Sequence, residues 1–227
     1  MIILIADSGS TKSDWLAIDE DGNELKQFST MGFNPYFHTS EIVESELNKN
    51  ADMRSLAPNV SRVFFYGAGS SSPEMCSVIE KGLKNVMPLA EISVGHDLEG
   101  AAFSTWSGTS AITCILGTGS NSCYFDGNKV YEEVPSLAYI LGDEGSGSWF
   151  GKRLLQAFFY KQLPKEMHDD FVSEFNLSVT DVTRKTYTEP NPNVFLASFM
   201  KFIAKHKDSD VVKGWLLEGF GAFLDAH

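Results

Sequence analysis

Residues 1–29, MIILIADSGSTKSDWLAIDEDGNELKQFS, contain the pattern from which the fold class follows. A short apolar run at residues 1–6 leads into a loop of small and polar residues, and a second apolar run follows at residues 15–18. An Asp-Gly-Asn sequence at residues 21–23 has the chemistry of a tight turn, after which residues 24–29 can return as a third strand. The stretch therefore predicts a meander of three antiparallel strands with a Gly/Ser/Thr loop between the first two.

The same order of features starts again at residue 111. Residues 111–133, AITCILGTGSNSCYFDGNKVYEE, give an apolar run, a Gly/Thr/Ser loop, a second run, an Asp-Gly-Asn turn and a third run. A repeat of about a hundred residues indicates two similar lobes and not a solenoid. We expect an N-terminal lobe at residues 1–108 and a C-terminal lobe at residues 109–227. Because no Pro-rich or Gly/Ser-rich linker separates them, we expect the lobes to pack around a shared cleft.

The rest of the chain indicates a mixed α/β architecture, with helices packed against the sheet. After residue 146 the pattern is mostly helical, with helical segments expected at residues 149–163, 166–175, 193–206 and 210–226. The elements expected in the first lobe after the meander are a helix at 41–50, a strand at 62–66, a helix at 73–87, a strand at 91–94 and a helix at 98–106.

The composition is that of a globular protein, with 43% hydrophobic and 21% charged residues among 227. Lys and Arg number 18 against 30 Asp and Glu, so the net charge of −12 disfavours nucleic acid and anionic membranes as partners. No apolar run approaches the roughly 20 residues of a membrane span, and the N-terminus lacks a secretory pattern. We therefore expect a cytoplasmic protein. The three widely spaced cysteines suggest neither a disulfide framework nor a zinc site.

The two loops at residues 7–12 and 117–121 have the composition of anion-binding sites, because small residues let backbone N–H groups point into one concavity. One such loop alone is more often a simple turn, but two in matched positions of a duplicated chain favour a phosphate clamp. They do not match the P-loop pattern, since Thr11 stands where that motif needs glycine.

Five ordered segments carry a family resemblance: DSGSTKSDW, FYGAG, GHDLEGA, ILGTGSNS and LGDEGSGSWFG. They resemble the BadF/BadG/BcrA/BcrD ATPase family, in particular its N-acetylglucosamine kinase branch, within the superfamily of sugar kinases, actin and heat-shock chaperone ATPases. The resemblance implies two ribonuclease-H-like lobes with mixed sheets and an interlobe cleft. It also implies a mostly helical C-terminal part that is incomplete here, since the family continues into a Gly-rich segment that packs on adenosine.

The resemblance implies ATP and Mg²⁺ as cofactors, with Asp7 holding the metal through water. An aspartate that only caps the following turn is the alternative for Asp7, and a solvated loop lysine is the alternative for Lys12. The residues expected to bind the ATP phosphates are Ser8, Gly9, Ser10, Thr11, Lys12, Gly117, Thr118, Gly119 and Ser120.

Asp97 is the expected general base. It follows the apolar strand at residues 92–94 and precedes a helix, which places its carboxylate at a strand end where ligands of open α/β sheets bind. From the residues alone, an ordinary helix N-cap is an equally good interpretation, and the resemblance favours catalysis. The neighbouring His96 is interpreted as incidental.

The resemblance also indicates where the acceptor sugar binds. Amide and carboxylate side chains suit a sugar because they form directed hydrogen bonds to several hydroxyls. Asn34 could instead form a turn before Pro35, and Asp143 could lie in a solvated acidic turn. The expected sugar-binding residues are Asn34, Asp97, Asn121, Asp143, Gly145 and Ser146.

These features predict ATP-dependent phosphorylation of an amino-sugar hydroxyl, with N-acetylglucosamine and its 6-hydroxyl as the first candidates. A homodimer is expected from the resemblance. An activator ATPase of a radical acyl-CoA dehydratase is one alternative, although the cysteines offer no obvious pair for its iron–sulfur cluster. A noncatalytic sugar or nucleotide sensor on a kinase fold is the other.

Overall fold

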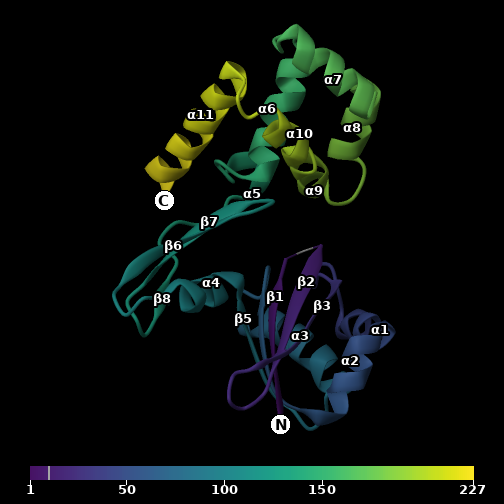
Figure 1. Cartoon of the computed structure of the whole chain (residues 1–227), viewed down its shortest axis with the longest axis vertical. Coiled ribbons are helices and arrows are strands. Elements are labelled where there is room, and N and C mark those ends of the chain that lie inside the picture. Colours follow the sequence, from purple (N-terminus) through teal and green to yellow (C-terminus); the bar gives the residue numbers. More distant parts are fainter. Residues whose placement is uncertain (10) are drawn as a thin grey trace. The chain divides into compact units, whose positions relative to one another are not determined.

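A computed structural model describes residues 1–9 and 11–227. The chain forms two compact units, which we name unit 1 (Met1–Gly108) and unit 2 (Thr109–His227) (Figure 1).

Unit 1 is built on a five-stranded mixed sheet with the order β3-β2-β1-β4-β5. The first three strands form the predicted antiparallel meander, and β4 and β5 run parallel to β1. The predicted mixed α/β fold is therefore confirmed for this unit. The strands are β1 (Ile2–Ser8), β2 (Lys12–Ile18), β3 (Glu24–Met31), β4 (Val60–Gly67) and β5 (Glu91–His96).

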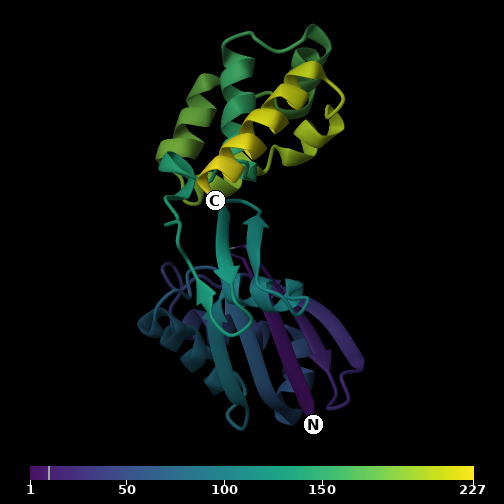
Figure 2. The same cartoon turned by 90° about the vertical axis from the view of Figure 1, so that its left-hand side faces the viewer.

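Helices cover both faces of this sheet, which Figure 1 shows nearly edge-on and Figure 2 nearly face-on. Alternate β1 residues such as Leu4 and Ala6 are buried in a core shared with Val43 and Ile79, which come from two of the helices. On the other face, Tyr66 packs edge-on against Phe103 with ring centroids 5.9 Å apart. The helices are α1 (Ser40–Lys49), α2 (Ala51–Leu56), the short 3₁₀ turn η1 (Ala57–Asn59), α3 (Pro73–Val86) and α4 (Asp97–Thr105).

Unit 2 begins with a three-stranded antiparallel sheet of order β6-β7-β8, which confirms the second meander. Its strands are β6 (Ala111–Leu116), β7 (Ser120–Phe125) and β8 (Val130–Tyr131). The remainder is helical, as predicted. Its helices are α5 (Ala138–Leu141), α6 (Gly147–Phe159), α7 (Lys165–Phe175), α8 (Val179–Tyr187), α9 (Pro192–Ala197), α10 (Met200–Lys205) and α11 (Asp210–Ala226).

Phenylalanine dominates the helical core of unit 2. Phe150, Phe171, Phe199 and Phe202 are almost completely buried, and Phe158 packs on Phe171 with ring centroids 4.3 Å apart. The apolar pattern of residues 193–206 indicates one helix, but the chain forms two, α9 and α10. The Ser198 hydroxyl donates to the Phe195 carbonyl oxygen at 2.7 Å, so the chain tightens into a turn there.

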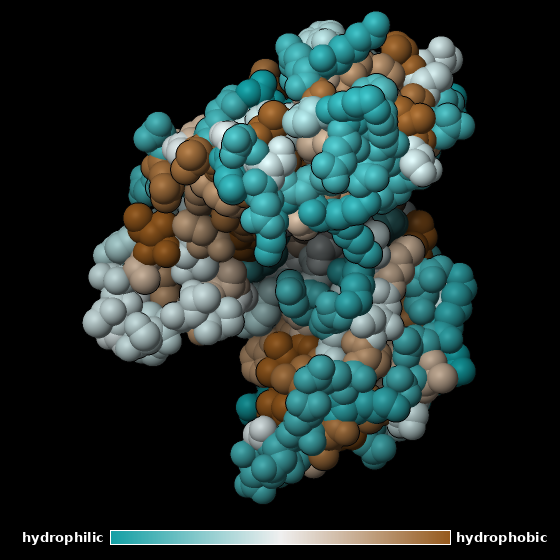
Figure 3. Space-filling view, turned by 45° about the horizontal axis from the view of Figure 1, so that its top comes forward, coloured by the Kyte–Doolittle hydropathy of each residue, from teal (hydrophilic) through white to brown (hydrophobic). Residues whose placement is uncertain are grey.

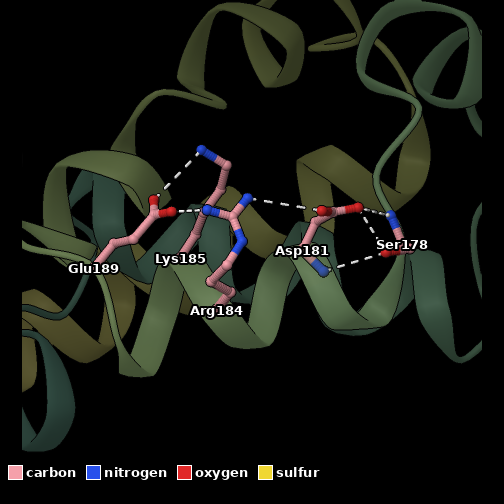
Figure 4. Close-up of polar contacts among 5 residues, drawn as sticks. All are labelled: Ser178, Asp181, Arg184, Lys185 and Glu189. Carbon is pink, nitrogen blue, oxygen red and sulfur yellow. Dashed lines mark hydrogen bonds and ion pairs between the residues drawn. The ribbon is translucent and has the colours of Figure 1, made fainter.

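Helix α8 lies outside the segments that the apolar pattern identifies, because its β-branched residues favour helix weakly. A polar network holds it instead (Figure 4). The Ser178 hydroxyl accepts a hydrogen bond from the Asp181 amide at 3.2 Å, and the Asp181 carboxylate accepts one from the Ser178 amide at 3.1 Å. Arg184 forms ion pairs with Asp181 and Glu189, and Lys185 also pairs with Glu189. Capping and side-chain ion pairs thus stabilise this helix and compensate for the weak helix propensity of its residues.

Hydrophilic residues cover most of the face shown in Figure 3, with hydrophobic residues in smaller patches. Exposed large hydrophobic side chains include Ile112 of β6 and Leu217 and Leu224 of α11. Within the described residues, none of the helices combines the length and the apolar character that crossing a membrane would require.

Candidate active site

The carboxyl ends of three parallel strands of unit 1 lie side by side. In the strand register Ser8 of β1 is opposite Gly67 of β4, which is in turn opposite His96 of β5. The loop after β1, the loop after β4 and the start of α4 therefore emerge from the same edge of the sheet. This is the edge at which open α/β sheets bind ligands.

The buried side chain of Ser8 stabilises the hairpin between β1 and β2. This side chain is fully buried, and its hydroxyl lies 2.6 Å from the Ser13 hydroxyl and accepts a hydrogen bond from the Phe33 amide at 3.0 Å. The Gly9 amide closes the hairpin by donating to the Lys12 carbonyl oxygen at 3.0 Å. Ser8 thus supports the hairpin, and its contact with phosphate stays a prediction. Ser10 lies outside the described residues.

Thr11 and Lys12 are exposed at this hairpin. The Lys12 ammonium lies 2.7 Å from the Asp14 carboxylate, and both side chains are more than half exposed. An ion pair of this kind contributes little to stability, so Lys12 can exchange Asp14 for an anionic ligand at small cost.

Gly32 lies directly against the same hairpin. A Cβ atom at residue 32 would be 2.2 Å from the Gly9 carbonyl oxygen and 2.5 Å from the Lys12 amide nitrogen. Only glycine allows this approach, because both neighbours are backbone atoms that cannot rotate away. The segment that carries Asn34 is thereby fixed to the candidate phosphate loop.

Asp97 is the first residue of α4, and His96 takes the N-cap position. The interpretation of Asp97 as the N-cap is therefore wrong by one residue. The His96 Nε2 atom lies 3.1 Å from Asp97 Oδ1, and the Glu99 carboxylate accepts a hydrogen bond from the His96 amide at 3.2 Å. His96 thus contacts the candidate base directly, which adjacency in sequence does not establish.

Asp7 stands beside this group at the end of β1. Desolvation and then the negative charges of Asp97 and Asp14 raise the pKa of the Asp7 carboxyl. A cation at this position would offset the repulsion among the three carboxylates.

Asn34 is nearly buried in the loop after β3. Its side-chain oxygen accepts a hydrogen bond from the Tyr36 backbone amide at 3.0 Å, and the backbone amide of Asn34 donates to His38 Nδ1 at 3.2 Å. A Cβ atom at Gly69 would lie 2.5 Å from Asn34 Oδ1, so the Asn34 side chain also packs against the loop after β4. The turn predicted as the alternative role is present, and contact with sugar stays a prediction.

The second candidate phosphate hairpin, Gly117–Asn121, connects β6 to β7 in unit 2. The Gly117 amide closes it by donating to the Gly119 carbonyl oxygen at 2.9 Å, and the Ser120 amide donates to Asp143 Oδ1 at 3.2 Å. Within the described residues, the amides of Thr118 and Gly119 at the tip donate no hydrogen bond. Two consecutive free N–H groups form the kind of nest that binds an anion.

Asp143 is 9% exposed, so it does not lie in a solvated turn. Its backbone has a positive φ of 59°, a conformation that aspartate and asparagine tolerate better than most residues. Burial raises the pKa of its carboxyl, while the hydrogen bond from Ser120 and the charge of Lys152 oppose this effect. The fold therefore keeps a carboxylate here at an electrostatic cost.

We expect the variant Asp143→Asn to be more stable than the wild type at pH 7, with a melting temperature about 2 °C higher. A raised folded-state pKa means that stability is lost as the pH rises through that pKa, because the buried carboxyl must then ionise. The amide avoids this cost and suits the positive φ. Melting curves between pH 4 and pH 8 should show the advantage shrinking as the pH falls, and an advantage independent of pH would contradict this account.

The other expected sugar ligands of unit 2 lie in the same region. Asn121 is the last residue of the hairpin and lies in β7, and its side-chain oxygen accepts a hydrogen bond from the Ser122 amide at 2.9 Å. Gly145 has a φ of +68° and packs against Gly219 of α11. The buried Ser146 caps α6, accepting from the Trp149 amide at 3.3 Å. Ser146 thus has a structural role whether or not it contacts a ligand.

A cavity of about 430 Å³ adjoins the second hairpin. Among the helical residues that line it, Phe150 has the aromatic character and helical spacing of a core residue, so apolar periodicity does not distinguish it from core. The lining residues are Leu116, Gly117, Thr118, Gly145, Gly147, Phe150, Ala197, Met200 and Phe220.

The described residues contain no group of three or more His, Cys, Asp or Glu side chains that could enclose a metal ion. Mg²⁺ does not require such a cage, because it commonly keeps several waters and binds one or two carboxylates together with substrate phosphates. Asp7, with Asp97 and Asp14 raising its pKa, fits that mode of binding.

Three solved structures to which this chain is similar illustrate the comparison. The "Putative N-acetylglucosamine Kinase" from Porphyromonas gingivalis is 37% identical, with a TM-score of 0.92 over 99% of this chain and 80% of that one. A "Putative N-acetylglucosamine Kinase" from Chromobacterium violaceum is 17% identical, with a TM-score of 0.71 over 98% and 81% of the two chains. A ROK family glucokinase from Streptomyces griseus, in complex with glucose and AMPPNP, is 16% identical, with a TM-score of 0.53 over 97% and 88%.

The last two matches share the fold. No protein-family model matches the sequence, and no curated protein does. The identity and coverage of the first match are sufficient to establish kinship. The chain therefore belongs to the family of the Porphyromonas gingivalis protein and has the actin-like ATPase fold of sugar kinases.

Proposed function

We propose that this protein is an ATP-dependent kinase that phosphorylates an amino-sugar hydroxyl, with the 6-hydroxyl of N-acetylglucosamine as the first candidate. The observation that carries the proposal is the position of Asp97, which starts α4 beside His96 at the strand edge that also bears Asp7 and the first phosphate hairpin. A base, a metal-binding carboxylate and a phosphate loop are the parts that phosphoryl transfer needs. The Porphyromonas gingivalis relative is named as a "Putative N-acetylglucosamine Kinase", which supports the choice of substrate.

In the proposed reaction, Asp97 accepts the proton of the acceptor hydroxyl as its oxygen bonds to the γ-phosphorus of ATP. The bond from that phosphorus to the bridging oxygen breaks, and ADP leaves. His96, 3.1 Å from Asp97, orients the carboxylate. Asp7 would hold a bound Mg²⁺, which would neutralise the phosphate charge.

ATP binding is proposed to use the backbone of both hairpins. The free amides of Thr118 and Gly119 offer hydrogen bonds to phosphate oxygens, and exposed Thr11 and Lys12 offer a hydroxyl and a charge. The adjoining cavity has apolar walls, including Phe150 and Phe220, that suit a nucleoside.

The acceptor is proposed to bind through Asn34, Asn121, Asp143, Gly145 and Ser146, in addition to Asp97. Membership of the BadF/BadG/BcrA/BcrD branch, the cytoplasmic location and the homodimer stay predictions from the sequence.

The proposed function is tested by ADP release with Mg²⁺ and ATP across N-acetylglucosamine, glucosamine, N-acetylmannosamine and glucose. We expect release that depends on sugar and is greatest with an N-acylated amino sugar. Release that ignores sugar would overturn the proposal and favour the activator ATPase. Absence of both release and nucleotide binding would favour a sensor of another ligand.

Filling the cavity of unit 2 tests the nucleoside site. We expect Ala197→Phe to weaken AMPPNP binding by roughly tenfold or more, because the new ring would occupy the volume beside the hairpin. Calorimetry measures the affinity. Ala57→Phe is the matched control, since Ala57 lines a cavity of about 420 Å³ in unit 1, away from the carboxyl ends of the strands. Equal affinities in the two variants would exclude the cavity as the nucleoside site.

A further inference from the structure

In unit 2 the segment Asp143–Ser148 is joined to the phosphate hairpin by four hydrogen bonds. In three of these bonds the segment contributes a backbone atom. In the fourth it contributes a side chain, the Asp143 carboxylate. The four bonds are Ser120 N to Asp143 Oδ1 (3.2 Å), Ser120 Oγ to Glu144 O (2.8 Å), Gly147 N to Gly117 O (2.8 Å) and Ser148 N to Thr118 O (3.0 Å).

The Asp143 carboxylate also lies flat against the tip of the hairpin. A Cβ atom at Gly119 would be 2.8 Å from Asp143 Oδ2 and 2.9 Å from Oδ1. Residue 119 must therefore be glycine for the carboxylate to approach, and the carboxylate fixes the backbone that precedes Ser120. The neighbouring amides of Thr118 and Gly119 are the ones left free for a ligand.

We propose that Asp143 is a positioning residue of the phosphate hairpin: its carboxylate holds the Ser120 amide and so aims the Thr118 and Gly119 amides at the phosphates of the nucleotide. This role rests on the proposed function and goes beyond it, because sugar contact alone gives Asp143 no part in nucleotide binding. The physical reason is preorganisation, since an anion nest binds best when its N–H groups need no rearrangement.

Two substitutions separate positioning from charge. Asp143→Asn keeps an acceptor oxygen for Ser120 and removes the negative charge, whereas Asp143→Gly removes both and still accepts the φ of 59°. Loss of a negative charge near a phosphate site favours anion binding in both variants. Only the glycine variant also loses the acceptor oxygen for the Ser120 amide, so only this variant should bind the anion more weakly.

The test measures AMPPNP affinity with Mg²⁺ and without sugar, so that sugar contact cannot contribute. We expect Asp143→Gly to weaken binding roughly fivefold or more and Asp143→Asn to leave it within about twofold of the wild type or to tighten it. Hydrogen exchange at the Ser120 amide should accelerate in the glycine variant and not in the asparagine variant. Should the glycine variant fail to fold, Gly119→Ala takes its place, because its Cβ would lie 2.8 Å from Asp143 Oδ2 and displace the carboxylate from the hairpin.

Wild-type affinity in the glycine variant, with unchanged exchange at Ser120, would overturn the positioning role. A wild-type protein that binds no AMPPNP would instead contradict the proposed function. Even then, hydrogen exchange at the Ser120 amide reports whether Asp143 holds the hairpin. Failure of the positioning role can therefore be distinguished from failure of the proposed function.

Discussion

Replacing Asp97 by asparagine is expected to lower the rate of sugar phosphorylation by about a thousandfold. The amide has nearly the shape of the carboxylate but cannot accept the proton of the sugar hydroxyl. Asp97 begins α4 at the carboxyl edge of the sheet, so its removal should leave the hairpins and the helix intact. The measurement is sugar-dependent ADP release under saturating ATP and sugar, together with AMPPNP affinity, which should change by less than about threefold.

Asp126→Asn is the matched control for this prediction. Asp126 is also an aspartate that accepts backbone hydrogen bonds, from Asn128 and Lys129 at 2.7 Å, but it lies in an exposed turn of unit 2. We expect its activity to equal that of the wild type. Full activity of Asp97→Asn would remove Asp97 as the base, and equal losses in the two variants would point to a general effect of the lost charge.

The second large effect is expected from Gly32→Ala. Its new methyl group would lie 2.2 to 2.7 Å from backbone atoms of Gly9, Thr11 and Lys12, so the first phosphate hairpin must move. Overpacking against a backbone that cannot rotate away costs about 2 kcal/mol of stability. We expect a lower melting temperature and AMPPNP affinity reduced at least tenfold, because the displaced hairpin no longer presents its backbone to phosphate.

Gly214→Ala controls for the glycine substitution itself. Residue 214 lies within α11, and a Cβ atom there would have no neighbour within 4 Å. Alanine favours helix by about 1 kcal/mol over glycine, so this variant should be as stable as the wild type or more so, with unchanged AMPPNP binding. If Gly32→Ala behaved in the same way, the close contact between residue 32 and the hairpin would be wrong.

Local sequence patterns predicted much of unit 1 and less of unit 2. The meander, β4, β5, α3 and α4 follow from apolar periodicity and turn residues, and the structure confirms them. The split between α9 and α10 escaped prediction because the apolar pattern continues through it, whereas the Ser198 hydroxyl donates back to the Phe195 carbonyl oxygen at the break. Helix α8 escaped because its caps and ion pairs outweigh the weak helix propensity of its residues.

The candidate site divides in the same way. Asp97, Asp7 and the two Gly/Ser/Thr hairpins could be identified from sequence, because strand ends and tight turns are set by neighbouring residues. Three contacts join residues 20 to 25 positions apart: Ser8 with Phe33, Gly32 with the first hairpin, and Asp143 with Ser120. Apolar periodicity does not encode such pairs, since it reports only which face of an element is buried.

Local patterns are enough to show that the chain repeats a strand-hairpin-strand unit and that each repeat carries a loop suited to phosphate, because glycine, serine and strand periodicity act over a few residues. Which amides of the second hairpin are free, and that Ala197, Met200 and Phe220 line a cavity beside it, depends on the packed fold. A cavity and a free N–H group are defined by what packs around them. Their neighbours come from helices some 80 to 100 residues further along the chain.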